Sequence, residues 1–74
     1  MTNEQIDTTF MYHAPWGDQA QRYEQIRSEA KALALIIQKL CPESREKSLA
    51  LTNLQQAVMW ANASIAINEA HSLA

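Results

Sequence analysis

The sequence contains a single cysteine, Cys41, and this shortage excludes two kinds of stabilising framework. One thiol cannot form an internal disulfide, and it cannot supply the several thiolates of a zinc cluster. A lone cysteine is typical of a protein kept in a reducing compartment. We interpret Cys41 as a small packed residue at the end of a helix rather than as a catalytic thiol.

The sequence also lacks an excess of positive charge and any long hydrophobic run. Its net charge of -2 argues against a protein that binds the DNA or RNA backbone, although a few local cations could still hold a small anion. The longest strictly apolar run, 32–37, is far shorter than the roughly twenty residues of a membrane span. The first twenty residues carry Glu4, Asp7 and Asp18 and do not resemble a signal peptide. We therefore expect a soluble, cytoplasmic protein.

Residues that break helices are scarce, with one glycine and two prolines among 74 residues. A hydrophobic fraction of 47% excludes a disordered chain, so the sequence predicts one folded, all-α domain. A monomer of this length would bury only about 60% of its unfolded surface, which makes its own stability marginal.

The first long helix is predicted from about residue 19 to about residue 40. Asp18 and Gln21 have the spacing of a capping box, and Pro42 ends the run. Its apolar residues alternate in steps of three and four, which is the spacing of a seam against another helix. They are Tyr23, Ile26, Ala30, Leu33, Ile37 and Leu40.

The second long helix is predicted from Arg45 to about His71, with Ser44 as its N-cap. The short connection makes the two helices an antiparallel hairpin. Its own seam consists of Leu51, Leu54, Val58, Ala61 and Ile65. A second apolar stripe projects roughly 150° away and consists of Leu49, Trp60, Ala63 and Ile67. Since one partner helix cannot cover both faces, we expect a symmetric homo-oligomer.

The residues before this hairpin, 1–17, form a separate aromatic segment of the same domain, and residues 18–74 form the hairpin. Pro15 and Gly17 keep the aromatic stretch from being a regular helix. The stretch contains Phe10, Met11, Tyr12, His13 and Trp16. The simplest interpretation is that its rings staple the open end of the hairpin.

We find no residues arranged for catalysis, no metal site and no need for a cofactor. Ser44 and Lys47 have a Ser-x-x-Lys spacing, but at the start of a helix this indicates an N-cap and a solvated lysine. His13 and His71 lie far apart and lack the flanking spacing of metal ligands. The sequence therefore does not predict an enzyme.

Two features favour a ligand that carries phosphate and bases. Arg27 and Lys31 lie one turn apart on the polar face of the first long helix, where they could hold a phosphate or be solvated cations moderated by Glu24. Tyr12, beside Phe10 and Trp16, could stack on a nucleobase. The combination indicates a nucleotide, although the same residue types also occur in small proteins that bind none.

Four separated strings resemble the phage anti-CBASS cyclic-nucleotide sponge family. They are Tyr12-His13-Ala14-Pro15, then Gln19 with Arg22-Tyr23-Glu24 and Ile26-Arg27, then Ser44 to Thr52, and finally Met59 to Ala66. The resemblance spans nearly the whole chain. It implies a compact helical homohexamer that sequesters cyclic oligonucleotide messengers from antiviral effectors.

The resemblance implies that Tyr12 stacks on a base of a cyclic dinucleotide such as cyclic GMP-AMP, while Arg27 meets its phosphate. We assign the pocket wall to His13, Pro15 and Lys31. The family also has separate pockets for cyclic trinucleotides, and Ile67 stands where the family commonly has arginine, so trinucleotide binding stays open. The alternatives are a structural protein-protein interaction module and a hydrolase of the messenger.

Overall fold

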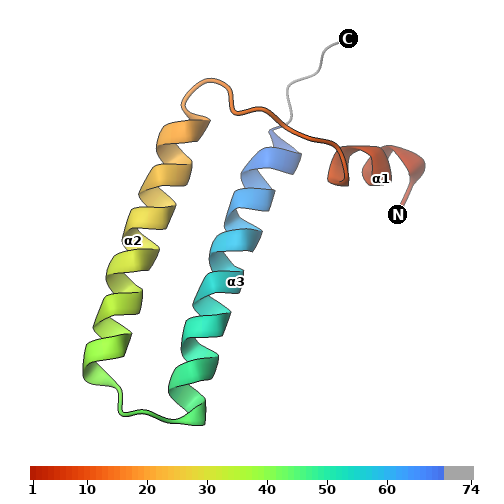
Figure 1. Cartoon of the computed structure of the whole chain (residues 1–74). Coiled ribbons are helices and arrows are strands. Elements are labelled where there is room, and N and C mark those ends of the chain that lie inside the picture. Colours follow the sequence, from red (N-terminus) through yellow and green to blue (C-terminus); the bar gives the residue numbers. More distant parts are fainter. Residues whose placement is uncertain (70–74) are drawn as a thin grey trace.

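The computed structural model describes residues 1–69, which form three helices and no strand. Helix α1 spans Asn3–Thr9, α2 spans Gln19–Leu40, and α3 spans Arg45–Asn68. Helices α2 and α3 lie side by side and antiparallel, while α1 projects away from the open end of this hairpin (Figure 1). The predicted all-α hairpin is therefore confirmed.

The bounds of α2 agree with the prediction, and α3 ends earlier than predicted. The α3 helix stops at Asn68, where the amide of Glu69 still donates to the Ile65 carbonyl at 3.1 Å. The predicted extension reached about residue 71, and His71 lies outside the described residues.

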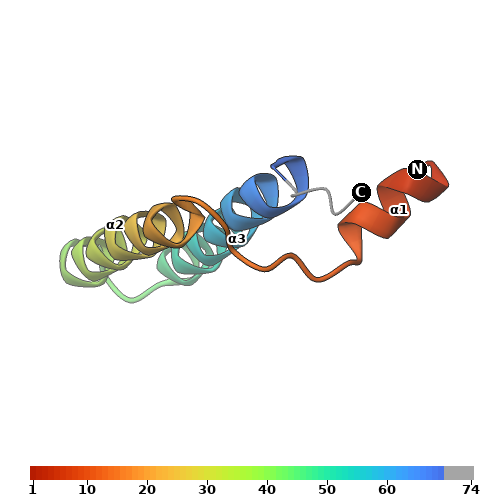
Figure 2. The same ribbon diagram turned by 90° about the horizontal axis from the view of Figure 1, so that it is seen from above.

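The hairpin is a single layer of two helices, as the view from above shows (Figure 2). The molecule measures 52 × 28 × 13 Å, so its thinnest dimension is about the diameter of one helix. Among residues 1–69 no hydrophobic side chain is buried. The two buried residues of this part are polar: Gln19 is 3% exposed and Lys47 is 6% exposed.

The closed end of the hairpin is held by polar contacts around Ser44 and Lys47. The Ser44 hydroxyl oxygen accepts from the Lys47 amide at 3.1 Å, which confirms Ser44 as the N-cap of α3. The Lys47 ammonium donates to the Gln38 carbonyl at 3.1 Å and to Glu43 Oε1 at 2.6 Å. The prediction of a solvated lysine was wrong, because Lys47 bridges the last turn of α2 to the connection.

Cys41 stands at the end of α2, as predicted, but it is exposed rather than packed. Its amide donates to the Ile37 carbonyl at 3.0 Å, and its extended backbone then leads into Pro42. The chain leaves the helix here because a residue before proline is driven toward extended conformations.

The start of α2 differs from the predicted capping box. Asp18 is the N-cap, but its side chain accepts no hydrogen bond from the helix backbone. Instead, Asp18 Oδ1 accepts from Arg22 Nε at 3.1 Å. The expected pairing with Gln21 was wrong because the Asp18 carboxylate is engaged by a cation on the next turn.

Helix α1 was not among the predicted elements, although its sequence carries a start signal. The Thr2 hydroxyl oxygen accepts from the Gln5 amide at 3.1 Å, and Gln5 Oε1 accepts from the Thr2 amide at 2.7 Å. This is a complete capping box with the usual spacing of three residues.

The second apolar stripe of α3 is uncovered over part of its length. Trp60 is 74% exposed and Leu49 is exposed, whereas Ala63 and Ile67 are half-buried. Exposed patches of large apolar side chains on a small protein usually mark contact surfaces. The stripe therefore stays our predicted subunit interface.

We predict that Trp60→Glu disrupts assembly while the hairpin stays partly helical. A charge without a partner costs several kcal/mol at an apolar interface and far less on an open surface. Light scattering and circular dichroism would measure the two properties, with Gln55→Glu as a control that adds the same charge elsewhere on α3. A parent mass near 8.4 kDa, the weight of one chain, would contradict the interface, as would an unchanged mass of Trp60→Glu.

Candidate ligand-binding site

Three of the five predicted ligand residues lie in the connection between α1 and α2. The Tyr12 side chain is 85% exposed, and Pro15 is also exposed. His13 is half-buried, and its Nε2 donates to the Thr8 carbonyl at 2.6 Å. That bond ties the connection back onto the last turn of α1 and leaves the Tyr12 ring turned to solvent.

The other two predicted ligand residues, Arg27 and Lys31, lie on α2. Arg27 donates to Glu24 Oε2 at 2.9 Å, and both side chains of this pair are about two-thirds exposed. The second oxygen of Glu24 accepts from the Ser28 hydroxyl at 3.3 Å. Lys31 is exposed one turn further along. Glu24 was predicted to moderate both cations, and in the folded chain it pairs with Arg27.

The predicted residues form two separate groups within one chain. Arg27 lies eight residues beyond Gln19, which corresponds to about 12 Å along the helix axis. The connection that carries Tyr12 crosses the open end of the hairpin toward α1, on the side of α3 (Figure 1). One chain therefore presents the ring and the cation at different places.

Trp16 fastens the connection to the hairpin. Its indole Nε1 donates to the Glu69 carbonyl at 3.0 Å, and its backbone amide donates to Gln19 Oε1 at 3.2 Å. Phe10 and Tyr12, by contrast, are at least 80% exposed. The stapling interpretation thus holds for Trp16 and was wrong for these two rings.

Arg22 and Glu69 close the open end of the hairpin, and sequence reasoning did not find them as a pair. The guanidinium donates to both carboxylate oxygens of Glu69, at 2.8 and 2.5 Å. These hydrogen bonds from Arg22 outweigh partial desolvation and hold the pKa of Glu69 below its ordinary 4.5. The same hydrogen bonds raise the pKa of Arg22. No local signal joins residues that lie so far apart in sequence.

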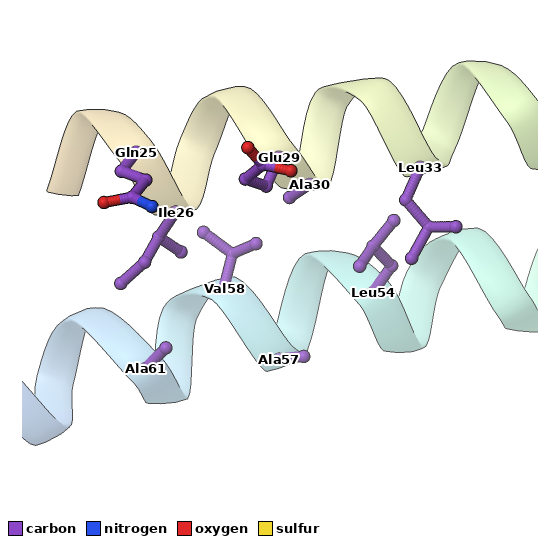
Figure 3. Close-up of a pocket in the computed structure, with 9 residues that line it drawn as sticks. All are labelled: Gln25, Ile26, Glu29, Ala30, Leu33, Leu54, Ala57, Val58 and Ala61. Carbon is purple, nitrogen blue, oxygen red and sulfur yellow. The ribbon is translucent and has the colours of Figure 1, made fainter. Parts of the chain in front are cut away.

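A groove of about 420 Å³ lies between α2 and α3, and its walls are mainly apolar (Figure 3). The side chains of Ile26, Leu33, Leu54 and Val58 project between the two helices, with Gln25 and Glu29 beside them. None of the five predicted ligand residues lines it. An anionic messenger gains little from apolar walls and is repelled by Glu29, so this groove is not our candidate site.

The comparison with protein families decides the identity of the fold. The model of the Acb2/Tad1 hairpin domain matches residues 2–66, which is most of the chain. The chain belongs to the Acb2/Tad1 hairpin-domain family. This is the phage anti-CBASS cyclic-oligonucleotide sponge family, and the sequence-based resemblance is confirmed. Comparisons with curated proteins and with solved structures gave no significant match.

Membership in the Acb2/Tad1 family gives the general role, which is the binding of cyclic oligonucleotides in phage defence against CBASS. The family is one of sponge-type binding proteins. Within residues 1–69 no cluster of three or more His, Cys, Asp or Glu side chains could hold a metal ion. Over the same residues, no helix is both long and apolar enough to cross a membrane.

We predict that the Arg22–Glu69 pair makes this Acb2/Tad1 chain sensitive to acid. Because folding lowers the pKa of Glu69, its stabilising effect is present above the unfolded pKa and is lost as the pH falls through the folded pKa. Resistance to thermal unfolding, followed through the loss of helicity, should therefore fall as the pH is lowered below about 4.5. The fall should be larger in the parent than in Glu69→Gln. Circular dichroism at a fixed chain concentration measures this, and parallel pH profiles for the two proteins would contradict it.

Proposed function

We propose that this chain sequesters cyclic dinucleotides such as cyclic GMP-AMP, releases them unchanged, and thereby keeps CBASS effectors inactive in the host cytoplasm. The observation that carries the proposal is the exposed Tyr12 ring, held on a tethered connection in a member of a cyclic-oligonucleotide-binding family. We assign recognition of a base to stacking on Tyr12 and recognition of a phosphate to the cation of Arg27.

Tyr12 is suited to stacking because its ring presents both faces and its backbone is restrained nearby. Stacking on an aromatic side chain is worth about 1 to 3 kcal/mol per base and tolerates any base. Covering the exposed ring with a base is itself favourable, because it removes aromatic surface from water. A ligand with two bases could use one Tyr12 ring from each of two copies.

Arg27 is suited to the phosphate because its guanidinium is exposed and presents a bidentate fork. Its present partner, Glu24, is also exposed, and such surface pairs contribute at most about 1 kcal/mol. A phosphate could replace Glu24 at small cost. Lys31 adds a second positive charge one turn away, and His13 and Pro15 would complete the wall beside Tyr12.

The separation of Tyr12 from Arg27 within one chain supports a site shared between copies. We propose a homo-oligomer, most simply a hexamer as the family resemblance implies, in which the connection of one copy lies near α2 of another. The absence of any buried hydrophobic side chain in residues 1–69 also supports assembly, because a chain that buries so little apolar surface is only marginally stable alone. Binding of cyclic trinucleotides at separate pockets is a weaker proposal, because Ile67 offers no charge to a phosphate.

The second candidate function is a structural module that binds another protein. It is favoured by the exposed apolar side chains of α2 and α3, among them Leu35, Leu40, Met59 and Trp60. Such faces could engage a host or phage protein as well as a second copy. A binding measurement with a cyclic dinucleotide separates the two functions, because the interaction module would not need to bind this ligand.

We predict that Tyr12→Ala and Arg27→Ala both weaken cyclic dinucleotide binding without changing the oligomeric mass. The first change removes a stacking contact worth about 1 to 3 kcal/mol per base. The second removes a charge-assisted hydrogen bond worth about 1.5 to 3 kcal/mol. Titration calorimetry with cyclic GMP-AMP measures both.

Two matched controls accompany these variants. Phe10→Ala removes an equally exposed ring from the same connection, and Lys39→Ala removes a cation from the last turn of α2. Both should bind like the parent. No binding by the parent at tens of micromolar would refute the dinucleotide proposal, and parental affinity in both site variants would place the ligand elsewhere.

We also predict that the messenger survives binding. After incubation with excess protein and heat denaturation, chromatography should recover cyclic GMP-AMP in full and unchanged. A time-dependent linear or mononucleotide product would show that the chain is a hydrolase. Free messenger before denaturation would favour the interaction module.

A further inference from the structure

The end of the connection that carries Tyr12 is anchored from two sides at Trp16. The indole Nε1 donates to the carbonyl of Glu69 at 3.0 Å, and the Trp16 amide donates to Gln19 Oε1 at 3.2 Å. The Gln19 side chain that accepts this bond is almost fully buried. The backbone amide of Gln19 donates to the Trp16 carbonyl at 3.1 Å. Both the ring and the backbone of Trp16 are therefore held against the hairpin.

Glu69, which receives the indole, is itself held by α2. Its carboxylate accepts two hydrogen bonds from Arg22, and Arg22 is steadied by Asp18 on the preceding turn. The side chain of Glu69 thus joins the end of α3 to the start of α2, while its backbone carbonyl receives the connection. We call Trp16, Gln19, Arg22 and Glu69 the latch.

Two local features restrain the chain between the latch and Tyr12. Proline fixes its own φ, and Pro15 also drives Ala14 toward an extended conformation. On the other side, His13 is bonded to the Thr8 carbonyl at 2.6 Å. Tyr12 therefore lies between Thr8 and His13, which this hydrogen bond joins, and three residues of chain separate it from Trp16.

We propose that the latch is a positioning device for the Tyr12 ring, so that contacts among Trp16, Gln19, Arg22 and Glu69 determine the affinity for a cyclic dinucleotide through Tyr12. This inference rests on the proposed function. A ring that is already oriented binds without the loss of backbone freedom that a loose segment would suffer. Ordering one residue of backbone corresponds to about tenfold in Kd.

The test is a double-mutant cycle between Trp16→Phe and Tyr12→Ala, measured by calorimetry with cyclic GMP-AMP. Trp16→Phe keeps an aromatic ring but removes the indole N–H that reaches Glu69. We expect it to weaken binding about tenfold when Tyr12 is present and less than about twofold when residue 12 is alanine. That difference is the signature of action through Tyr12, which a general loss of stability would not produce.

Glu69→Gln gives a second cycle with Tyr12→Ala, because it removes the charge that holds Arg22 and keeps the carbonyl that receives Trp16. Its matched control is Glu46→Gln, the same change in the first turn of α3, which should bind like the parent. If Trp16→Phe does not retain the parent's helicity and oligomeric mass, the cycle with Glu69→Gln tests instead whether the latch acts through Tyr12.

The outcomes distinguish the latch from the proposed function. If the parent does not bind cyclic GMP-AMP, the proposed function and the positioning role of the latch are both refuted. If the parent binds and Tyr12→Ala weakens binding, the proposed function stands, and the cycle then judges the latch alone. Equal effects of the latch variants in both backgrounds, or no effect in either, would overturn the positioning role.

Discussion

The constraint on which the whole structure depends is that two helices side by side form one layer, and one layer has no interior. The thin dimension of 13 Å and the absence of a buried hydrophobic side chain in residues 1–69 are two expressions of it. Apolar burial is the main favourable term in folding, and in the single chain many large apolar side chains are still exposed. The proposed assembly would supply the missing second layer, and its symmetry would place each connection beside another copy.

In this layer without a core, polar contacts join the two helices at both ends. Lys47 bridges the closed end through the Gln38 carbonyl and Glu43, and Arg22 bridges the open end through Glu69. Both are long basic side chains whose charged groups each donate to more than one acceptor. These contacts link α2 to α3 at both ends of the layer.

Sequence periodicity predicted α2 and the hairpin well, because the spacing of apolar residues and the breaks at Pro42 and Ser44 are local signals. Helix α1 could have been predicted from Thr2 and Gln5, whose capping box was overlooked. The latch could not, since Arg22 and Glu69 look like ordinary surface charges until folding brings them together. Of the five predicted ligand residues, the resemblance selected Tyr12 and Arg27, and one chain does not bring these two into one place.

The proposed site is better suited to holding a ligand than to transforming it. Catalysis relies on groups fixed around the reacting atoms in a site that excludes water. The Tyr12 ring and the Arg27 guanidinium are instead exposed, and the nearby charges are engaged in ion pairs. The proposed binding would need only rings and cations that neighbouring copies bring together over the ligand. A chain of 74 residues can meet that demand by repetition, since each added copy contributes another ring and another cation.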